Sequence, residues 1–325
     1  MVSDKAWKKS PQIAHQLQNA KEIETTVLNH RAVVAGLQPR LRGIQAIITA
    51  SESTAGAHKG PHTLTKRANR QGIATYTLQH GFENVGLTYF DADYPVGKIK
   101  FASKTIFTWG ETAQLPPEIP SETRAKCVAV GCPKATYPPN HTLPIPGHNS
   151  RDRLIAIFEN LHWSRYSDRY RQTFLQDLHK TAAAHPKTTF VIKPHPTGLW
   201  LTQGYPDNLQ TLSNLQVANP QDPTWAAFNA ATLIAMADIT ITTPSTIALD
   251  AARAGCPVAV VAYDLSLANF EPLTLLRQSS DWQALVGRKD TQPLKERAQG
   301  FARKRLIPGN AIERIISQIS SDRAN

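Results

Sequence analysis

The sequence is poor in cysteine and has no long apolar run. Its three cysteines, Cys127, Cys132 and Cys256, are odd in number and lack CxxC spacing, so neither a disulfide framework nor a zinc site is expected. This usage is typical of a reducing cytoplasm. No stretch of about 18 apolar residues occurs, so no membrane span is predicted. The opening residues, MVSDKAWKKSPQ, lack the apolar core of a signal peptide.

The sequence also lacks the signatures of nucleic-acid-binding modules. No RNP motif, zinc finger or basic heptad region is present, although the net charge is +11 and basic residues lie in small groups along the chain. Such an excess suits phosphate neutralisation on nucleic acid. It also suits an enzyme that handles anionic donors at an anionic membrane, where each basic residue contributes about 1 kcal/mol. We favour the second interpretation and predict no nucleic-acid partner.

What is present is the composition of a globular protein of two domains. The chain has 325 residues, of which 41% are hydrophobic and 19% charged. Short apolar runs separated by helical patterns predict parallel α/β domains. The segment 138–150, rich in Pro, Gly and Asn, is the predicted boundary. We therefore assign residues 1–145 to a first domain and residues 146–325 to a second.

Each predicted domain has its own series of elements. In the first domain we expect helices at 13–37 and 63–71 and strands at 44–50, 74–78, 106–109 and 128–130. In the second we expect strands at 153–158, 190–193, 239–243 and 258–262 and helices at 166–184, 225–237 and 247–254. Two Rossmann-like domains leave a cleft between their facing loops, and ligands in such sheets bind beyond the carboxyl ends of the strands.

The first donor-binding candidate is the segment Lys193-Pro194-His195-Pro196. It continues the apolar run that begins at residue 190, which is typical of a buried parallel strand. Proline holds the preceding residue extended, so we expect Lys193 and His195 to project to the same side. An ammonium and an imidazole at a strand end suit an anionic ligand. The alternative is that the His195 ring satisfies a loop carbonyl.

The second candidate is the turn Pro244-Ser245-Thr246. It connects a β-branched strand to a helix that Gly255 is expected to end in left-handed geometry. Backbone amides and hydroxyls at a helix start form an anion site, so Thr243, Ser245 and Thr246 are candidates for donor binding. The two hydroxyl residues of the turn are equally suited to ordinary helix capping. We expect this strand end and that of residue 193 to be neighbours that together bind a phosphorylated donor.

Asp250 lies about one turn into that helix. From there a carboxylate can reach ribose hydroxyls, as acidic residues do in other nucleotide folds. The alternative is that it favours the positive end of the helix dipole.

The strongest catalytic candidate in the first domain is His80. It follows a predicted strand, precedes Gly81, and has the carboxylate of Glu83 three residues away. A histidine base with a pKa near neutrality contributes about 10² to 10⁴ in rate to deprotonation of a hydroxyl. Glu52, in a hydroxyl-rich segment after the first strand, and Glu83 are the carboxylate alternatives. Gln79 is a further residue expected at the cleft.

The series LQHG, GCPK, KPHP, TPSTIALDAARAGCPV and IPGNAIERI resembles bacterial surface-polysaccharide transferases of the GT-B fold. The groups it is most similar to are capsule-type Kdo transferases and CDP-glycerol glycerophosphotransferases of teichoic acid synthesis. The resemblance spans residues 44–318. It implies two Rossmann-like domains with parallel sheets facing across a cleft. It also implies that the QHG-like segment lies at the active site and that Gly131 and Lys134 lie near the ligand.

The resemblance implies a glycosyltransferase that moves a sugar from a nucleotide-activated donor, such as CMP-Kdo, to a polysaccharide or lipid-linked acceptor at the inner face of the cell membrane. One alternative is transfer of glycerol phosphate from CDP-glycerol, and another is sugar-nucleotide 2-epimerisation, although the Ser-Gly-Gly turn is absent. A third is a binding or assembly subunit without catalysis. No cofactor and no metal are expected, since cations and helix starts neutralise the leaving phosphate in many GT-B enzymes. We interpret Asp91-Ala92-Asp93 as a solvated turn.

Overall fold

The computed structural model describes most of the chain. The described residues are 41, 43–50, 52–54, 58–79, 81, 99–115, 117, 119–134, 144–146, 148–149, 152–195, 198, 200–203 and 212–324. The helix predicted at 13–37 lies outside them. The protein is α/β, with two parallel sheets, as predicted.

The chain divides into two units. One comprises Met1–Ala135 together with Arg303–Asn325, and the other comprises Thr136–Ala302. The sequence-based assignment gave all of residues 146–325 to the second domain. The structure differs at the C-terminus because the last helix packs on the sheet of the first unit.

The first unit contains a four-stranded parallel sheet of order β1-β2-β3-β4. Its strands are β1 (Ala46–Thr49), β2 (Ala74–Leu78), β3 (Thr105–Thr108) and β4 (Cys127–Ala129). The helix α4 (Lys59–Arg70) packs Leu64 and Ala68 against Ile47 on one face. The short helices η3 (Thr112–Gln114) and α5 (Ser121–Arg124) lie between β3 and β4.

The other face of this sheet is covered by α12 (Ala311–Ala324), which follows α11 (Gln292–Arg305). Ile315 and Ile319 are four residues apart, so they lie on one side of α12 and pack with the ring of Tyr76. The Tyr76 hydroxyl also donates to Asp322 Oδ2 at 2.8 Å. This apolar stripe is what binds the end of the chain to the first unit.

The second unit contains a six-stranded parallel sheet of order β10-β9-β8-β5-β6-β7. Its strands are β5 (Arg153–Glu159), β6 (Thr188–Pro194), β7 (Leu215–Val217), β8 (Ile239–Thr242), β9 (Val258–Val261) and β10 (Thr274–Leu276). Its helices are α6 (Asp168–Ala184), α7 (Trp200–Gln203), η5 (Pro223–Trp225), α8 (Ala230–Met236), α9 (Ile247–Arg253), η6 (Ala268–Phe270) and α10 (Ser279–Val286).

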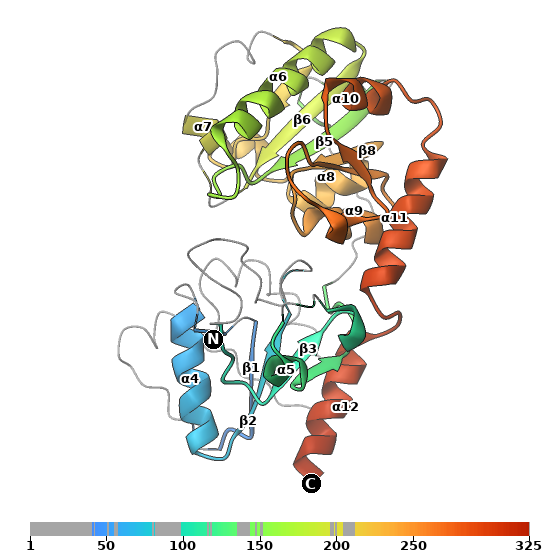
Figure 1. Cartoon of the computed structure of the whole chain (residues 1–325). Helices are drawn as coiled ribbons and strands as arrows, with labels where there is room; N and C mark the ends of the chain where they lie inside the picture. Colours follow the sequence, from blue (N-terminus) through green and yellow to red (C-terminus); the bar gives the residue numbers. More distant parts are fainter. Residues whose placement is uncertain are drawn as a thin grey trace. The chain divides into compact units, whose positions relative to one another are not determined.

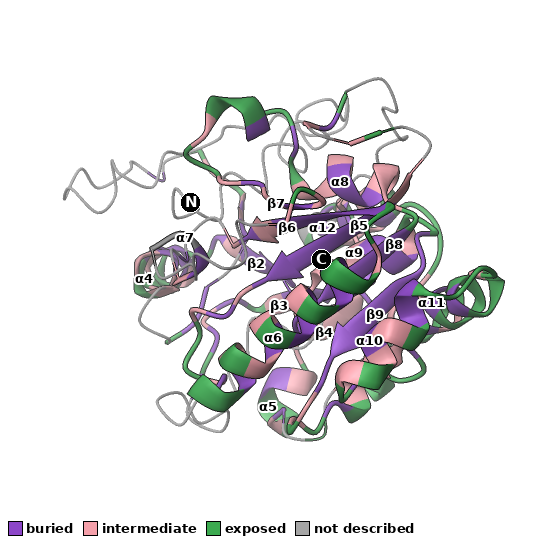
Figure 2. Cartoon of the chain, turned by 90° about the horizontal axis from the view of Figure 1, so that it is seen from above, coloured by how far each residue is buried: buried purple, intermediate pink, exposed green. Residues whose placement is uncertain are grey.

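Helices cover both faces of this sheet (Figure 1). On one face α6 and α10 place Phe174 and Trp282 against Ile155 and Ile157 of β5. On the other face α8 contacts β5, and α9 contacts β8 and β9. Figure 2 shows the central strands as buried and exposed residues on the outer sides of α6 and α10, whereas α8 and α9 carry only buried and intermediate residues. A strand buried on both faces reads as a continuous apolar run, which is why the sequence identified β5, β6, β8 and β9.

The strands β7 and β10 were not predicted. Each has three residues and lies at an edge of the sheet, and neither is buried along its whole length as β8 and β9 are. Among the described residues, no helix combines the length and the apolar character needed to span a membrane. None of Cys127, Cys132 and Cys256 forms a disulfide.

Candidate functional site

The carboxyl edge of the six-stranded sheet contains a topological switch point. From β5 the chain proceeds to β6 on one side, and β8 later pairs with β5 on the other side. The loops that leave β5 and β8 therefore diverge, and ligands of open α/β sheets bind in the crevice at such a point. The candidate site consists of the ends of β6, β5 and β8.

The ends of β6 and β8 are not neighbours, so this part of the sequence-based prediction was wrong. Lys193 of β6 and Thr242 of β8 both pair with Phe158 of β5. Two interstrand spacings separate the outer strands by about 10 Å. A ligand that contacts both must lie over the end of β5.

The end of β6 supplies the two predicted cations. Lys193 is half-buried, and burial lowers the pKa of its ammonium. His195 is also half-buried, and its ring lies against that of His162, with centroids 4.8 Å apart. Gly198 closes this loop by donating its amide to the carbonyl of His195 at 2.9 Å. Its backbone lies so close to His162 that a Cβ would be 2.2 Å from Nδ1.

The end of β8 supplies the predicted hydroxyls. Ser245 is half-buried, and its Oγ lies 3.0 Å from Thr242 Oγ1 and accepts the amide of Ile247 at 3.2 Å. Thr246 is the N-cap residue of α9 and makes no side-chain capping bond, whereas Thr243 is fully buried. Asp250 is half-buried in the first turn of α9. The predicted left-handed geometry of Gly255 is confirmed by its φ of 73°.

The side chain of Thr243 is fixed by two hydrogen bonds to Asn160. Its hydroxyl donates to Asn160 Oδ1 at 2.5 Å and accepts the Asn160 amide at 3.1 Å. These contacts fix Thr243 at the start of the turn that follows, and its predicted contact with the donor stays a prediction.

Sequence reasoning did not identify Glu159 and Asn160 at the end of β5. The Glu159 side chain is only 4% exposed and accepts the amide of Leu161 at 2.7 Å and the backbone amide of His195. Burial raises its pKa to about 7, and these two amide bonds partly offset the effect. The signal was a carboxylate and an amide directly after the apolar run of residues 154–158.

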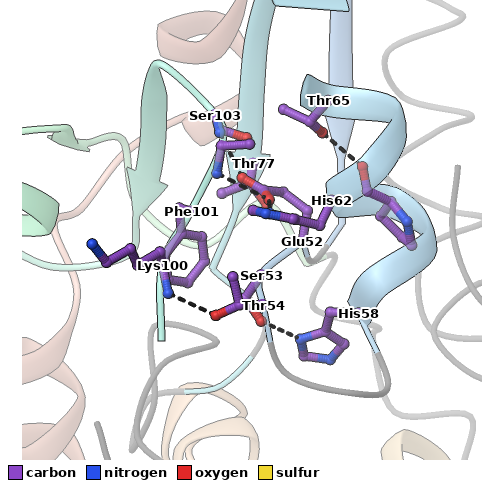
Figure 3. Close-up of polar contacts among 12 residues, drawn as sticks. Glu52, Ser53, Thr54, His58, His62, Thr65, Thr77, Lys100, Phe101 and Ser103 are labelled. Carbon is purple, nitrogen blue, oxygen red and sulfur yellow. Dashed lines mark hydrogen bonds and ion pairs between the residues drawn. The ribbon is translucent and has the colours of Figure 1, made fainter. Parts of the chain in front are cut away.

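In the first unit, Glu52 is completely buried and its carboxylate is saturated with contacts (Figure 3). It accepts from His62 Nδ1 at 2.7 Å, from the Ala102 amide at 3.2 Å and from the Ser103 amide at 2.6 Å. Beside it, Ser53 Oγ lies 3.1 Å from His58 Nδ1. Glu52 thus ties the exit of β1 to α4 and to the segment before β3, which is a structural role and does not favour its predicted role as a base.

Among the described residues of the first unit, Gln79 follows β2, and Gly131 and Lys134 follow β4. Gln79 is buried; its side chain accepts the Trp109 amide at 2.7 Å and donates to the carbonyl of Gly81 at 2.8 Å. Gly131 has a φ of 92°, and Lys134 Nζ lies 5.0 Å from the centroid of the Trp109 ring. His80, Glu83, Pro196 and the segment Asp91–Asp93 lie outside the described residues.

Comparison with known proteins shows the fold. No family model and no curated protein matches the chain. Solved structures do match it: an S. aureus MnaA–UDP co-structure has a TM-score of 0.68 at 11% identity and covers 100% of this chain and 95% of its own. The UDP-GlcNAc 2-epimerase of Neisseria meningitidis bound to UDP-GlcNAc has a TM-score of 0.59 at 14% identity, covering 90% and 81%.

The wall teichoic acid polymerase TagF with CDPG also matches, with a TM-score of 0.53 at 12% identity, covering 86% of this chain and 72% of its own. These similarities confirm the predicted GT-B fold of two Rossmann-like domains. The match to TagF agrees with the predicted resemblance to enzymes of teichoic acid synthesis. The resemblance to Kdo transferases stays a prediction.

Proposed function

We propose that the protein is a transferase that uses a nucleotide-activated donor, bound at the carboxyl edge of the six-stranded sheet. The observation that carries the proposal is the placement of Lys193 and His195 on one side of β5 and of Ser245 and Thr246 on the other. Cations and hydroxyls on two sides of a switch point suit the phosphate of a nucleotide. The half-buried Lys193 ammonium gains more from an anion than an exposed one would, because screening is weaker there.

The reaction we favour is glycosyl transfer. The acceptor hydroxyl attacks the anomeric carbon, the bond from that carbon to the phosphate oxygen breaks, and the nucleotide leaves with the bonding electrons. Lys193 and His195 stabilise the charge that develops on the leaving phosphate. His80 is proposed to take the proton of the hydroxyl. This scheme needs no metal, and the acceptor is a polysaccharide or lipid-linked saccharide at the inner face of the cell membrane.

The rival reactions use the same donor site. Transfer of glycerol phosphate from CDP-glycerol requires an acceptor, whereas sugar-nucleotide 2-epimerisation requires none. An assembly subunit would bind nucleotide and convert nothing. Incubation of the protein with labelled CMP-, CDP- and UDP-linked donors, with and without acceptor, therefore separates the four possibilities by their products.

Nucleotide binding is tested first, by thermal unfolding of the full chain with CMP, CDP, UDP and GDP. A nucleotide at about 100 times its Kd adds about 2.7 kcal/mol to the free energy of unfolding and raises Tm. We expect His195→Ala to abolish this shift. The matched control is His179→Ala, a half-buried histidine of α6 outside the carboxyl edge, and it should retain the shift.

Catalysis is tested with His80→Ala, which should keep the nucleotide shift and lose transfer. A wild-type chain that no nucleotide stabilises would overturn the proposed function. Stabilisation that persists in His195→Ala would move the donor site away from the end of β6.

A further inference from the structure

The strand between the two proposed ligand-binding arms ends in a dipeptide whose side chains reach both of them. Glu159 and Asn160 are consecutive residues at the end of β5, and β5 lies between β6 and β8. Glu159 bonds to the backbone of His195 after β6, and Asn160 bonds to the turn after β8. Neither residue belongs to the set expected from the sequence.

The contacts of Asn160 use its whole side chain. Its Nδ2 donates to the carbonyl of Pro244 at 3.2 Å, and its Oδ1 accepts the hydroxyls of Thr243 and Tyr166, each at 2.5 Å. The Tyr166 hydroxyl also lies 3.3 Å from the Pro244 carbonyl. Together these bonds fix the backbone of residues 243 and 244, which directly precede Ser245.

The contacts of Glu159 act on the other arm. Its carboxyl group is buried and accepts the backbone amide of His195 as well as that of Leu161. This hydrogen bond holds the backbone of His195, from which the imidazole ring projects, to β5. The ladder of the sheet separates the strands that lead into the two arms by about 10 Å. Glu159 and Asn160 then fix the loop after each of these strands relative to β5.

We infer that Glu159 and Asn160 are positioning residues that hold the cationic and hydroxyl arms of the donor site at the spacing that the donor phosphate requires. The inference rests on the proposed function for its ligand. The positioning itself is a property of the fold and can be measured without any ligand.

The chain offers a matched control for Asn160 in Asn214. It is also a half-buried asparagine that joins three backbone groups, donating from Nδ2 to the carbonyls of Ala182, His185 and Thr188, each at 3.0 Å. It directly precedes β7 and bonds to the segment before β6, so it lies at the amino edge of the sheet, opposite the candidate site. Asn214→Ala should therefore destabilise the fold as Asn160→Ala does and leave donor binding intact.

The first measurement is hydrogen exchange of the full chain without ligand. Asn160→Ala should speed exchange of the amides of Thr243 and of residues 245–248 by about tenfold, as expected for the loss of about one net hydrogen bond. In Asn214→Ala these amides should exchange at the wild-type rate. Tyr166→Phe, which removes a single donor to Asn160, should give a smaller increase and serves if Asn160→Ala fails to fold.

The second measurement is the affinity for the nucleotide that stabilises the wild type, by calorimetry. We expect Asn160→Ala to raise Kd by about tenfold or more and Asn160→Asp to recover part of this loss, because Asp keeps the acceptor for both hydroxyls. In turnover, KM for the donor should rise more than kcat falls. Glu159→Ala should likewise raise KM for the donor more than it lowers kcat. Glu159→Gln, which retains an acceptor, should have a smaller effect on KM.

The outcomes separate the two proposals. A wild-type chain that binds no nucleotide overturns the proposed function. Exchange at residues 243–248 that is unchanged in Asn160→Ala, or a Kd that rises equally in Asn160→Ala and Asn214→Ala, overturns the positioning role.

Discussion

Replacing Glu159 by Gln should make the protein more stable than the wild type at neutral pH and remove a specific pH dependence. The folded-state pKa of Glu159 is about 7, against an ordinary value of 4.5, because the carboxyl group is buried beside only two backbone donors. Between these two pH values the folded state keeps a proton that the unfolded state has released. Unfolding then releases a proton, so stability falls as the pH rises through this window.

The magnitude follows from the two pKa values. A separation from 4.5 to about 7, at about 1.4 kcal/mol per pH unit, corresponds to about 3 kcal/mol between acidic and neutral pH. Below pH 4.5 the group is protonated in both states, so its ionisation has no effect there. Above pH 7 the cost of the buried charge is fully present and constant.

The assay is urea unfolding of the full chain, followed by tryptophan fluorescence at several pH values from 4.5 to 8. The quantity compared is the difference in the free energy of unfolding between Glu159→Gln and wild type. In this difference the contributions of ionisable groups common to both proteins cancel. It should rise in favour of Gln up to pH 7 and then level off. The exposed Glu296, changed to Gln, controls for the loss of one negative charge. A difference that stays flat across the window, or rises in favour of the wild type, would refute the reasoning.

Three further predictions concern packing and contacts. Phe174→Ala, which removes a fully buried ring 5.7 Å from that of Trp282, should cost about 3–5 kcal/mol in urea unfolding, and a loss below about 2 kcal/mol would contradict its place in the core. Tyr76→Phe should cost about 1 kcal/mol by removing the bond to Asp322, and the same change in an Asp322→Ala background should cost nothing more. Gly198→Ala should weaken nucleotide binding with a smaller change in Tm, since its Cβ would displace the ring of His162; unchanged affinity would argue against a role for this histidine pair.

Patterns within single segments predicted the local elements and the chemistry at their ends. The strand at 74–78 was predicted with the bounds that the structure shows, and the turn from β8 into α9 and the left-handed Gly255 followed from local rules. These features depend on residues within one segment, so periodicity and turn chemistry suffice to predict them. The same rules placed Lys193 and Ser245 at strand ends.

Which strand ends lie side by side followed from the packing of the folded chain and not from any local pattern. Strand order placed β5 between β6 and β8, so that Glu159 and Asn160 reach both arms of the candidate site. The return of α12 to the first sheet through Ile315 is of the same kind. Strand order and helix docking are set by packing between residues far apart in the sequence, and burial then sets the pKa of Glu159. No pattern within a single segment carries that information.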